Sequence, residues 1–68
     1  MLYADEIYDA VEAEIRRPEY ATSPTAMLDA AREKVEAMLN VPCLAQFLAD
    51  GSVEIVTTRR WMRLIVRR

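Results

Sequence analysis

Residues 52–67 read Ser-Val-Glu-Ile-Val-Thr-Thr-Arg-Arg-Trp-Met-Arg-Leu-Ile-Val-Arg, and this stretch decides the fold class. β-Branched, aromatic and arginine residues dominate it, a composition typical of strands. We predict strands over 52–57 and 60–67 that pair as an antiparallel hairpin around Thr58-Arg59. This dipeptide is a poor two-residue turn, so a four-residue turn that shifts the pairing by two residues stays open. Both registers keep the same side chains on each face.

The alternation of side chains gives this hairpin two unlike faces. The first face is wholly apolar, suits a covering of helices, and comprises Val53, Ile55, Met62, Leu64 and Val66. The second places apolar and aromatic side chains beside arginines, as interface hot spots do. It is the candidate partner-binding patch and comprises Val56, Trp61, Arg63, Ile65 and Arg67. In the two-residue-turn register Val56 faces Trp61. The alternative to an exposed binding patch is that the first helix wraps round the hairpin and buries Trp61 inside the monomer.

Three helices are predicted ahead of the hairpin, over 3–17, 24–39 and 42–50. In the first two, apolar residues recur every three or four positions, which gives each helix an apolar stripe. The stripes are Tyr3, Ile7, Val11 and Ile15 in the first helix, and Met27, Ala31, Val35 and Met38 in the second.

Helix-starting and helix-ending residues set the bounds of the second and third helices. Ser23 is expected to cap the second helix and Pro24 to occupy its first position. Asn40 is a plausible left-handed stop. Pro42 can open the third helix, and Gly51, the only glycine of the chain, would end it.

The length and composition predict one small α+β domain over residues 1–68, with three helices packed on a C-terminal two-stranded antiparallel hairpin. A core of this size is marginal, and self-association can support it, so we expect a homodimer. Cys43 is the only cysteine and there is no histidine, so neither an internal disulfide nor a metal site is expected. A lone cysteine fits a cytoplasmic location. No targeting or membrane-spanning stretch is evident.

Charge is unevenly distributed along the chain. Residues 1–50 carry four basic and ten acidic side chains, a net charge of −6, whereas residues 51–68 carry five arginines and one acid, a net charge of +4. Two interpretations stay open. The basic end packs against the acidic helices, or it forms a patch for nucleic acid or an acidic protein.

No residue pattern indicates catalysis. Histidine, the usual base for a nucleophile, is absent. Cys43 lies among apolar neighbours, which make a thiol inert. A single glycine excludes a glycine-rich phosphate loop, and a chain this short does not readily enclose a substrate site. We therefore predict a protein that is not an enzyme, with no catalytic residue, metal, cofactor or small-molecule substrate.

The predicted function is stoichiometric binding of another protein, as a small binding module or an inhibitor of a host protein encoded by a phage or mobile element. The alternative is a dimeric β-ribbon DNA-binding regulator or an antitoxin-like protein. In that alternative the contacts to nucleic acid come from Arg59, Arg60, Arg63, Arg67 and Arg68. A membrane is not an expected partner.

One segment resembles a known family. The stretch 49–55 (Ala-Asp-Gly-Ser-Val-Glu-Ile), followed by 58–60 (Thr-Arg-Arg) and 64–66 (Leu-Ile-Val), resembles the helix-then-hairpin segment of prevent-host-death antitoxins. The resemblance covers about a quarter of the chain. That family begins with a strand, whereas two helices are predicted to begin this chain, so we carry over no function.

Overall fold

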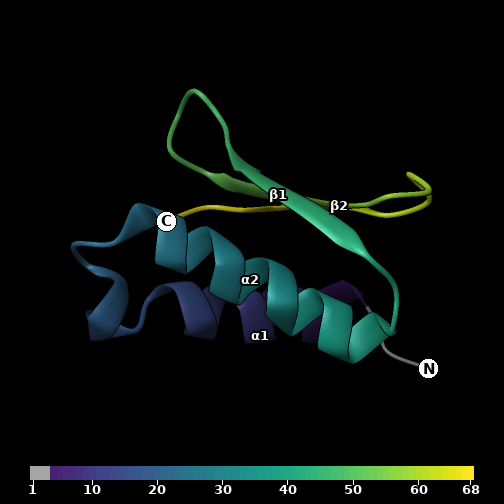
Figure 1. The fold of residues 1–68 in the computed structure, drawn as a ribbon, viewed down its shortest axis with the longest axis horizontal. Coiled ribbons are helices and arrows are strands. Elements are labelled where there is room, and N and C mark those ends of the chain that lie inside the picture. Colours follow the sequence, from purple (N-terminus) through teal and green to yellow (C-terminus); the bar gives the residue numbers. More distant parts are fainter. Residues whose placement is uncertain (1–3) are drawn as a thin grey trace.

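The computed structural model describes residues 4–68. In chain order these residues form helix α1 (Ala4–Ile15), a 3₁₀ turn η1 (Pro18–Tyr20), helix α2 (Pro24–Leu39), and strands β1 (Cys43–Phe47), β2 (Val53–Thr57) and β3 (Arg63–Val66). The strands make one antiparallel sheet in the order β1-β2-β3. Both helices lie on the same side of this sheet (Figure 1). The predicted α+β class is confirmed, but with two α-helices and three strands.

The two helices bury the apolar stripes that the sequence predicts. Their buried residues are Ile7, Val11 and Ile15 in α1, and Met27, Ala31 and Val35 in α2. The predicted helix start at Tyr3 lies outside the described residues. The helix ends at Ile15, two residues earlier than predicted, and Arg17 already has the extended backbone that a following proline favours (φ −65°, ψ 137°).

Helix α2 begins and ends where the sequence predicts, although one predicted contact is wrong. The Ser23 side chain makes no capping hydrogen bond, and its carbonyl instead accepts the Met27 N–H at 3.0 Å. Pro24 occupies the first turn, where its missing N–H costs nothing. At the other end Asn40 is left-handed (φ 57°), and its N–H donates to the Glu36 carbonyl at 2.7 Å.

The predicted third helix over 42–50 is wrong, because this segment forms strand β1 and the turn after it. The strand alternates, with Leu44 and Gln46 exposed and Cys43, Ala45 and Phe47 packed towards the core. The physical reason lies in β2, whose second edge would otherwise keep unpaired backbone groups. Strand β1 satisfies those groups from Cys43↔Thr57 to Phe47↔Val53.

A tight turn joins β1 to β2. The Leu48 carbonyl accepts the Gly51 N–H at 2.9 Å, and the Leu48 N–H donates to the Ser52 carbonyl at 2.8 Å. Gly51 has φ 88°, a conformation that suits only glycine, so it serves a hairpin and not the helix end that was predicted. The Asp50 carboxylate accepts the Ser52 N–H at 2.9 Å and braces the turn.

The hairpin between β2 and β3 has the longer of the two predicted turns. Residues 58–61 form that turn, and the register pairs Val56 with Arg63. The shorter-turn pairing of Val56 with Trp61 is therefore wrong, and Trp61 lies in the turn. The predicted faces survive, because a shift of two residues leaves each side chain on its side of the sheet.

Thr57 organises this second turn. Its hydroxyl oxygen accepts the N–H groups of Trp61 at 3.1 Å and of Met62 at 3.3 Å. Arg60 adopts a left-handed backbone (φ 60°), and its N–H donates to the Thr57 carbonyl at 2.8 Å. Three backbone donors of a loop without glycine thus find partners on one threonine.

The core lies between the helices and one face of the sheet. Val53 and Ile55 of the central strand β2 are fully buried. The remaining buried apolar side chains of the sheet are Cys43, Leu64 and Val66. All five belong to one cluster with the buried residues of α1 and α2. Because both helices lie on the same side of the sheet, the opposite side receives no cover from either helix (Figure 1).

Candidate binding surface

The side of the sheet turned away from the helices is the candidate functional surface. We call it the outer face and define it by the side chains of Leu44, Gln46, Glu54, Val56, Arg63 and Ile65. Three residues of the predicted patch lie on it: Val56 and Arg63 are directly opposed, and Ile65 is paired with Glu54. Arg67 follows β3 at one end of the sheet, and Trp61 lies in the turn at the other end.

Large hydrophobic side chains remain exposed on the outer face and in the β2–β3 turn. Within residues 4–68 they are Leu44 at 56% exposure, Trp61 at 57% and Ile65 at 37%. No helix wraps round to enclose Trp61, so the alternative in which it is buried in the monomer does not hold. One side of the sheet therefore keeps its apolar residues in contact with water.

A carboxylate whose charge is balanced by an arginine occupies the middle of the outer face. Glu54 is only 9% exposed, because Gln46 and Arg63 cover it from the two flanking strands. Gln46 Nε2 donates to Glu54 Oε1 at 2.7 Å, and Arg63 Nε donates to Glu54 Oε2. These hydrogen bonds, that of Gln46 first, lower the pKa of Glu54. The network holds all three polar side chains in place without a partner.

Two hollows lie beside exposed apolar side chains, and the first of them adjoins this network. The first, of about 270 Å³, lies above β1 and β2 and is lined by Leu44, Ala45, Gln46, Glu54, Val56 and Arg60. The second, of about 440 Å³, lies beside the β2–β3 turn and is lined by Asn40, Val41, Pro42, Thr57, Thr58, Arg59 and Trp61. Each hollow thus combines an exposed apolar side chain with an arginine.

The basic residues of the helical layer are paired within that layer. Arg16 lies 3.4 Å from Glu12, and Arg32 lies 2.8 Å from Glu36. Lys34 of α2 reaches Glu14 of α1 at 3.7 Å. Arg17 completes the set through Glu14 and Glu19. The acidic helices therefore neutralise part of their charge with their own cations.

The basic C-terminal segment does not pair with those helices. Arg63 pairs with Glu54 of the same segment. Among residues 4–68, four arginines make no ion pair, namely Arg59, Arg60, Arg67 and Arg68. The interpretation in which the basic end neutralises the acidic helices through ion pairs therefore does not hold.

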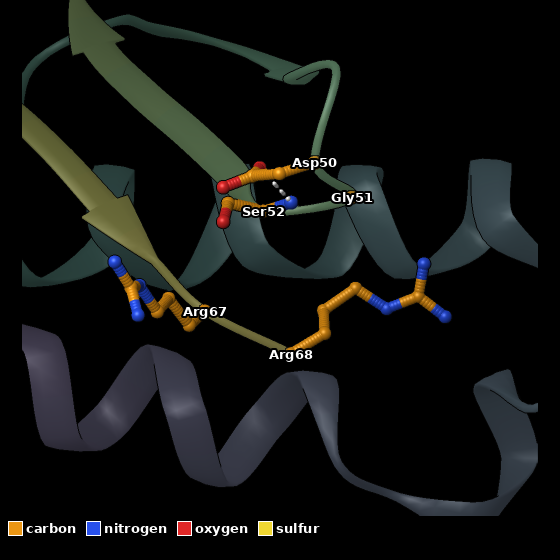
Figure 2. A pocket seen from close by; sticks show the side chains of 5 residues that line it. All are labelled: Asp50, Gly51, Ser52, Arg67 and Arg68. Carbon is orange, nitrogen blue, oxygen red and sulfur yellow. Dashed lines mark hydrogen bonds between the residues drawn. The ribbon is translucent and has the colours of Figure 1, made fainter.

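The arginines of the nucleic-acid alternative fall into two groups. Arg59 and Arg60 lie in the β2–β3 turn, near Arg63 at the start of β3. Arg67 and Arg68 follow the other end of β3, where they line a hollow of about 530 Å³ beside the β1–β2 turn. Figure 2 shows their side chains pointing away from each other. Arg68 lies over the Phe47 ring, 5.4 Å from its centroid, so this hollow is not a two-arginine anion clamp.

Sequence reasoning missed Leu44 and Gln46. Both were placed in the predicted third helix, so neither was assigned to the sheet. The signal was present in the alternation of residues 43–47, where every second side chain faces the core. The apolar content of the segment favoured a helix, because a short apolar run does not by itself distinguish helix from strand.

Cys43 has a structural position. Its side chain is buried, and burial raises the pKa of the thiol. The Cys43 N–H donates to the Glu36 carboxylate at 2.8 Å, which fastens β1 to α2. Residues 4–68 contain no group of three or more histidine, cysteine, aspartate or glutamate side chains placed to hold a metal ion. No helix in the same range is both long enough and apolar enough to cross a membrane.

Comparison with known proteins gives no match. No family model fits the chain, and neither a curated protein nor a solved structure is significantly similar to it. Any functional conclusion must therefore come from the geometry of the surface itself.

Proposed function

We propose that this protein acts by binding another protein through its outer face together with Trp61, as a non-enzymatic binding module or stoichiometric inhibitor. The observation that carries the proposal is the exposure of three large hydrophobic residues, with Leu44 and Ile65 on the outer face and Trp61 in the β2–β3 turn at one end of the sheet. Tryptophan and arginine around an apolar centre are the residues that contribute most to protein interfaces.

Energetics also support binding of a protein. Exposed apolar surface gains roughly 25 cal/mol for each Å² that a partner removes from water. The Glu54 network is already hydrogen-bonded before any partner arrives, so a partner that covers it leaves no carboxylate unpaired. The arginines at the rim would steer an acidic partner towards this face.

The third strand argues against the alternative of a two-stranded ribbon in DNA. A β-ribbon enters a major groove about 12 Å wide. With β1 paired to β2 the sheet has three strands spaced about 4.8 Å apart, and side chains widen it further. The arginines also divide between the two ends of β3. Retention on nonspecific DNA that falls steeply with added salt would instead favour DNA binding.

Truncation of Trp61 tests the proposed function. The N–H that Thr57 binds belongs to the backbone, so Trp61→Ala keeps the hydrogen bonds of the turn. We expect the free energy of unfolding of the variant to lie within about 1 kcal/mol of the wild-type value, as is usual for substitutions at exposed positions. We expect at least about a thirtyfold loss of affinity for the native partner, as at a hot spot.

Two arginine variants provide the matched comparison. Arg59→Ala removes an unpaired cation beside Trp61, whereas Arg16→Ala removes a cation that follows α1 and pairs with Glu12 in the helical layer. The first should weaken capture of the partner and the second should not. A folded Trp61→Ala protein that captures its partner as well as the wild type would contradict the proposal.

A further inference from the structure

Strand β3 has an open edge. The Thr57 N–H donates to the Met62 carbonyl at 3.1 Å, which sets the alternation of the β2–β3 ladder. By this alternation Leu64 and Val66 point their backbone groups at β2, whereas Arg63 and Ile65 point theirs outwards. Within residues 4–68 the backbone N–H groups of Arg63 and Ile65 donate no hydrogen bond, and β3 is the last strand of the sheet.

The other edge of the sheet is partly covered. In β1 the backbone groups of Cys43, Ala45 and Phe47 point away from β2, since the Thr58 N–H donates to the Pro42 carbonyl. The first of these donors is already taken, because the Cys43 N–H binds the Glu36 carboxylate of α2. The outward donors of β3 are therefore all open, whereas one of the three in β1 is already taken by α2.

The charges on β3 discourage pairing with a second copy of the chain. Antiparallel pairing of two β3 strands centred on Ile65 would place Arg63 of each copy opposite Arg67 of the other. Like charges directly opposite each other destabilise a strand pair, and charged edge residues protect natural sheets from self-pairing. The same two arginines would favour a strand that carries acids at those positions.

We propose that β3 adds a strand from a partner protein, and that this strand reads acidic-x-apolar-x-acidic. The acids would face Arg63 and Arg67, and the apolar residue would cover Ile65, all on the outer face. Arg67 makes no ion pair within residues 4–68, and the Arg63 side chain stays 60% exposed beside Glu54. This inference rests on the proposed function, since it names the chemistry of a protein partner and the way in which it docks.

A capped peptide, Thr-Glu-Thr-Val-Thr-Glu-Thr, serves as the probe with the full chain. We expect millimolar peptide to protect the amides of Arg63, Ile65 and Arg67 from hydrogen exchange. The amides of Leu64 and Val66 already bond to β2 and should change little. A peptide with lysines in place of both glutamates should bind at least tenfold more weakly. Equal binding of the two peptides, or protection of helix amides alone, would overturn the inference.

Backbone methylation separates strand pairing from simple charge attraction. N-Methylation of the peptide valine removes an N–H aimed at β3 and should weaken binding at least tenfold. Methylation of the next threonine removes an N–H that points away, so it should have a much smaller effect. If both methylated peptides bind like the parent, the peptide does not extend the sheet.

Variants of the chain test the same edge. Arg67→Glu should weaken binding of the acidic peptide by up to about fivefold and strengthen binding of the lysine peptide. The matched variant Arg68→Glu changes the net charge equally at a residue that lies over Phe47, so it should spare both peptides. Ile65→Pro removes an outward N–H and should abolish binding, whereas Ile65→Ala keeps that donor and should retain part of it.

The failure of this inference is distinguishable from failure of the proposed function. If Trp61→Ala loses the native partner while no peptide protects β3, only the strand addition is overturned. If the peptide protects β3 while Trp61→Ala keeps its partner, the proposed role of Trp61 is overturned and the strand addition stands. If oligothymidylate displaces the acidic peptide and binds more tightly, the basic edge serves nucleic acid and the inference is wrong.

Discussion

Glu54 shows how a single residue can be charged, nearly buried and satisfied. Its two carboxylate oxygens accept hydrogen bonds from Gln46 of β1 and Arg63 of β3, so one side chain ties the three strands together on the outer face. A charge so covered would be costly without such partners. Because Arg63 also flanks the open edge of β3, Glu54 fixes the position of a residue to which we assign a binding role.

Replacement of this carboxylate should change the pH dependence of stability. The pKa of Glu54 is lowered from an ordinary value of 4.5, so its stabilising contribution is present above about pH 4.5 and is lost as the pH falls through the folded-state pKa. We expect Glu54→Gln to lower the free energy of unfolding at pH 7 and to reduce the loss between pH 7 and pH 3. Urea unfolding across this range measures both changes.

Asp50 provides the comparison for this experiment. Hydrogen bonds from Ser52 lower its pKa too, so part of the acid sensitivity should remain in Glu54→Gln. Wild-type and variant curves that stay parallel from pH 7 to pH 3 would show that Glu54 contributes nothing through its charge.

Among the elements, strand β1 shows most clearly where local sequence is insufficient. Residues 42–50 are compatible with a short helix when taken alone, since Pro42 can open one and Gly51 can end one. The backbone groups of β2 on the side away from β3 need partners, and β1 supplies them. A long-range requirement therefore overrides a local preference, and Gly51 becomes the left-handed residue of a hairpin turn.

The β1–β2 turn offers a test of this assignment. At Gly51 a methyl group would meet no heavy atom within 4 Å, so Gly51→Ala should cost only the strain of a left-handed backbone, about 1–2 kcal/mol in the free energy of unfolding. The matched change is Arg60→Gly, which relieves a left-handed arginine in the other turn and should leave stability unchanged or improved. An equally stable Gly51→Ala protein would contradict the turn geometry.

At the scale of the whole molecule, two layers share one core and leave one face uncovered. Ile55 and Ile65 lie in neighbouring strands but on opposite sides of the sheet, and their exposures are 0% and 37%. A chain of 68 residues has a total stability of about 3–10 kcal/mol, so one large core truncation removes much of it. The two isoleucines therefore report on the two faces.

Alanine substitution at these two positions should give very different results. Ile55→Ala leaves a cavity between the layers and should cost about 2–5 kcal/mol of the free energy of unfolding. Ile65→Ala removes side-chain area that water already reaches in part, and should cost no more than about 1 kcal/mol. Thermal and urea unfolding provide the measurement. Similar costs at both positions would mean that the outer face is covered in solution.

The association state of the chain stays a prediction. The sequence predicts a homodimer, and the arginines of β3 make its edge a poor place for self-pairing. Mass measurement in solution over a range of protein concentrations, with wild type and Trp61→Ala compared, tests whether a second copy covers the outer face.

The sequence by itself determined the helical stripes, the bounds of α2, the strand character of the last sixteen residues and the two faces of their hairpin. These features depend on side-chain periodicity and on residues such as Asn40, which act within a few positions along the chain. Only the tertiary structure decided that residues 43–47 are a strand and that Leu44 and Gln46 lie on the outer face. It also decided which arginines have partners, because strand pairing and ion pairs join residues that local pattern does not relate.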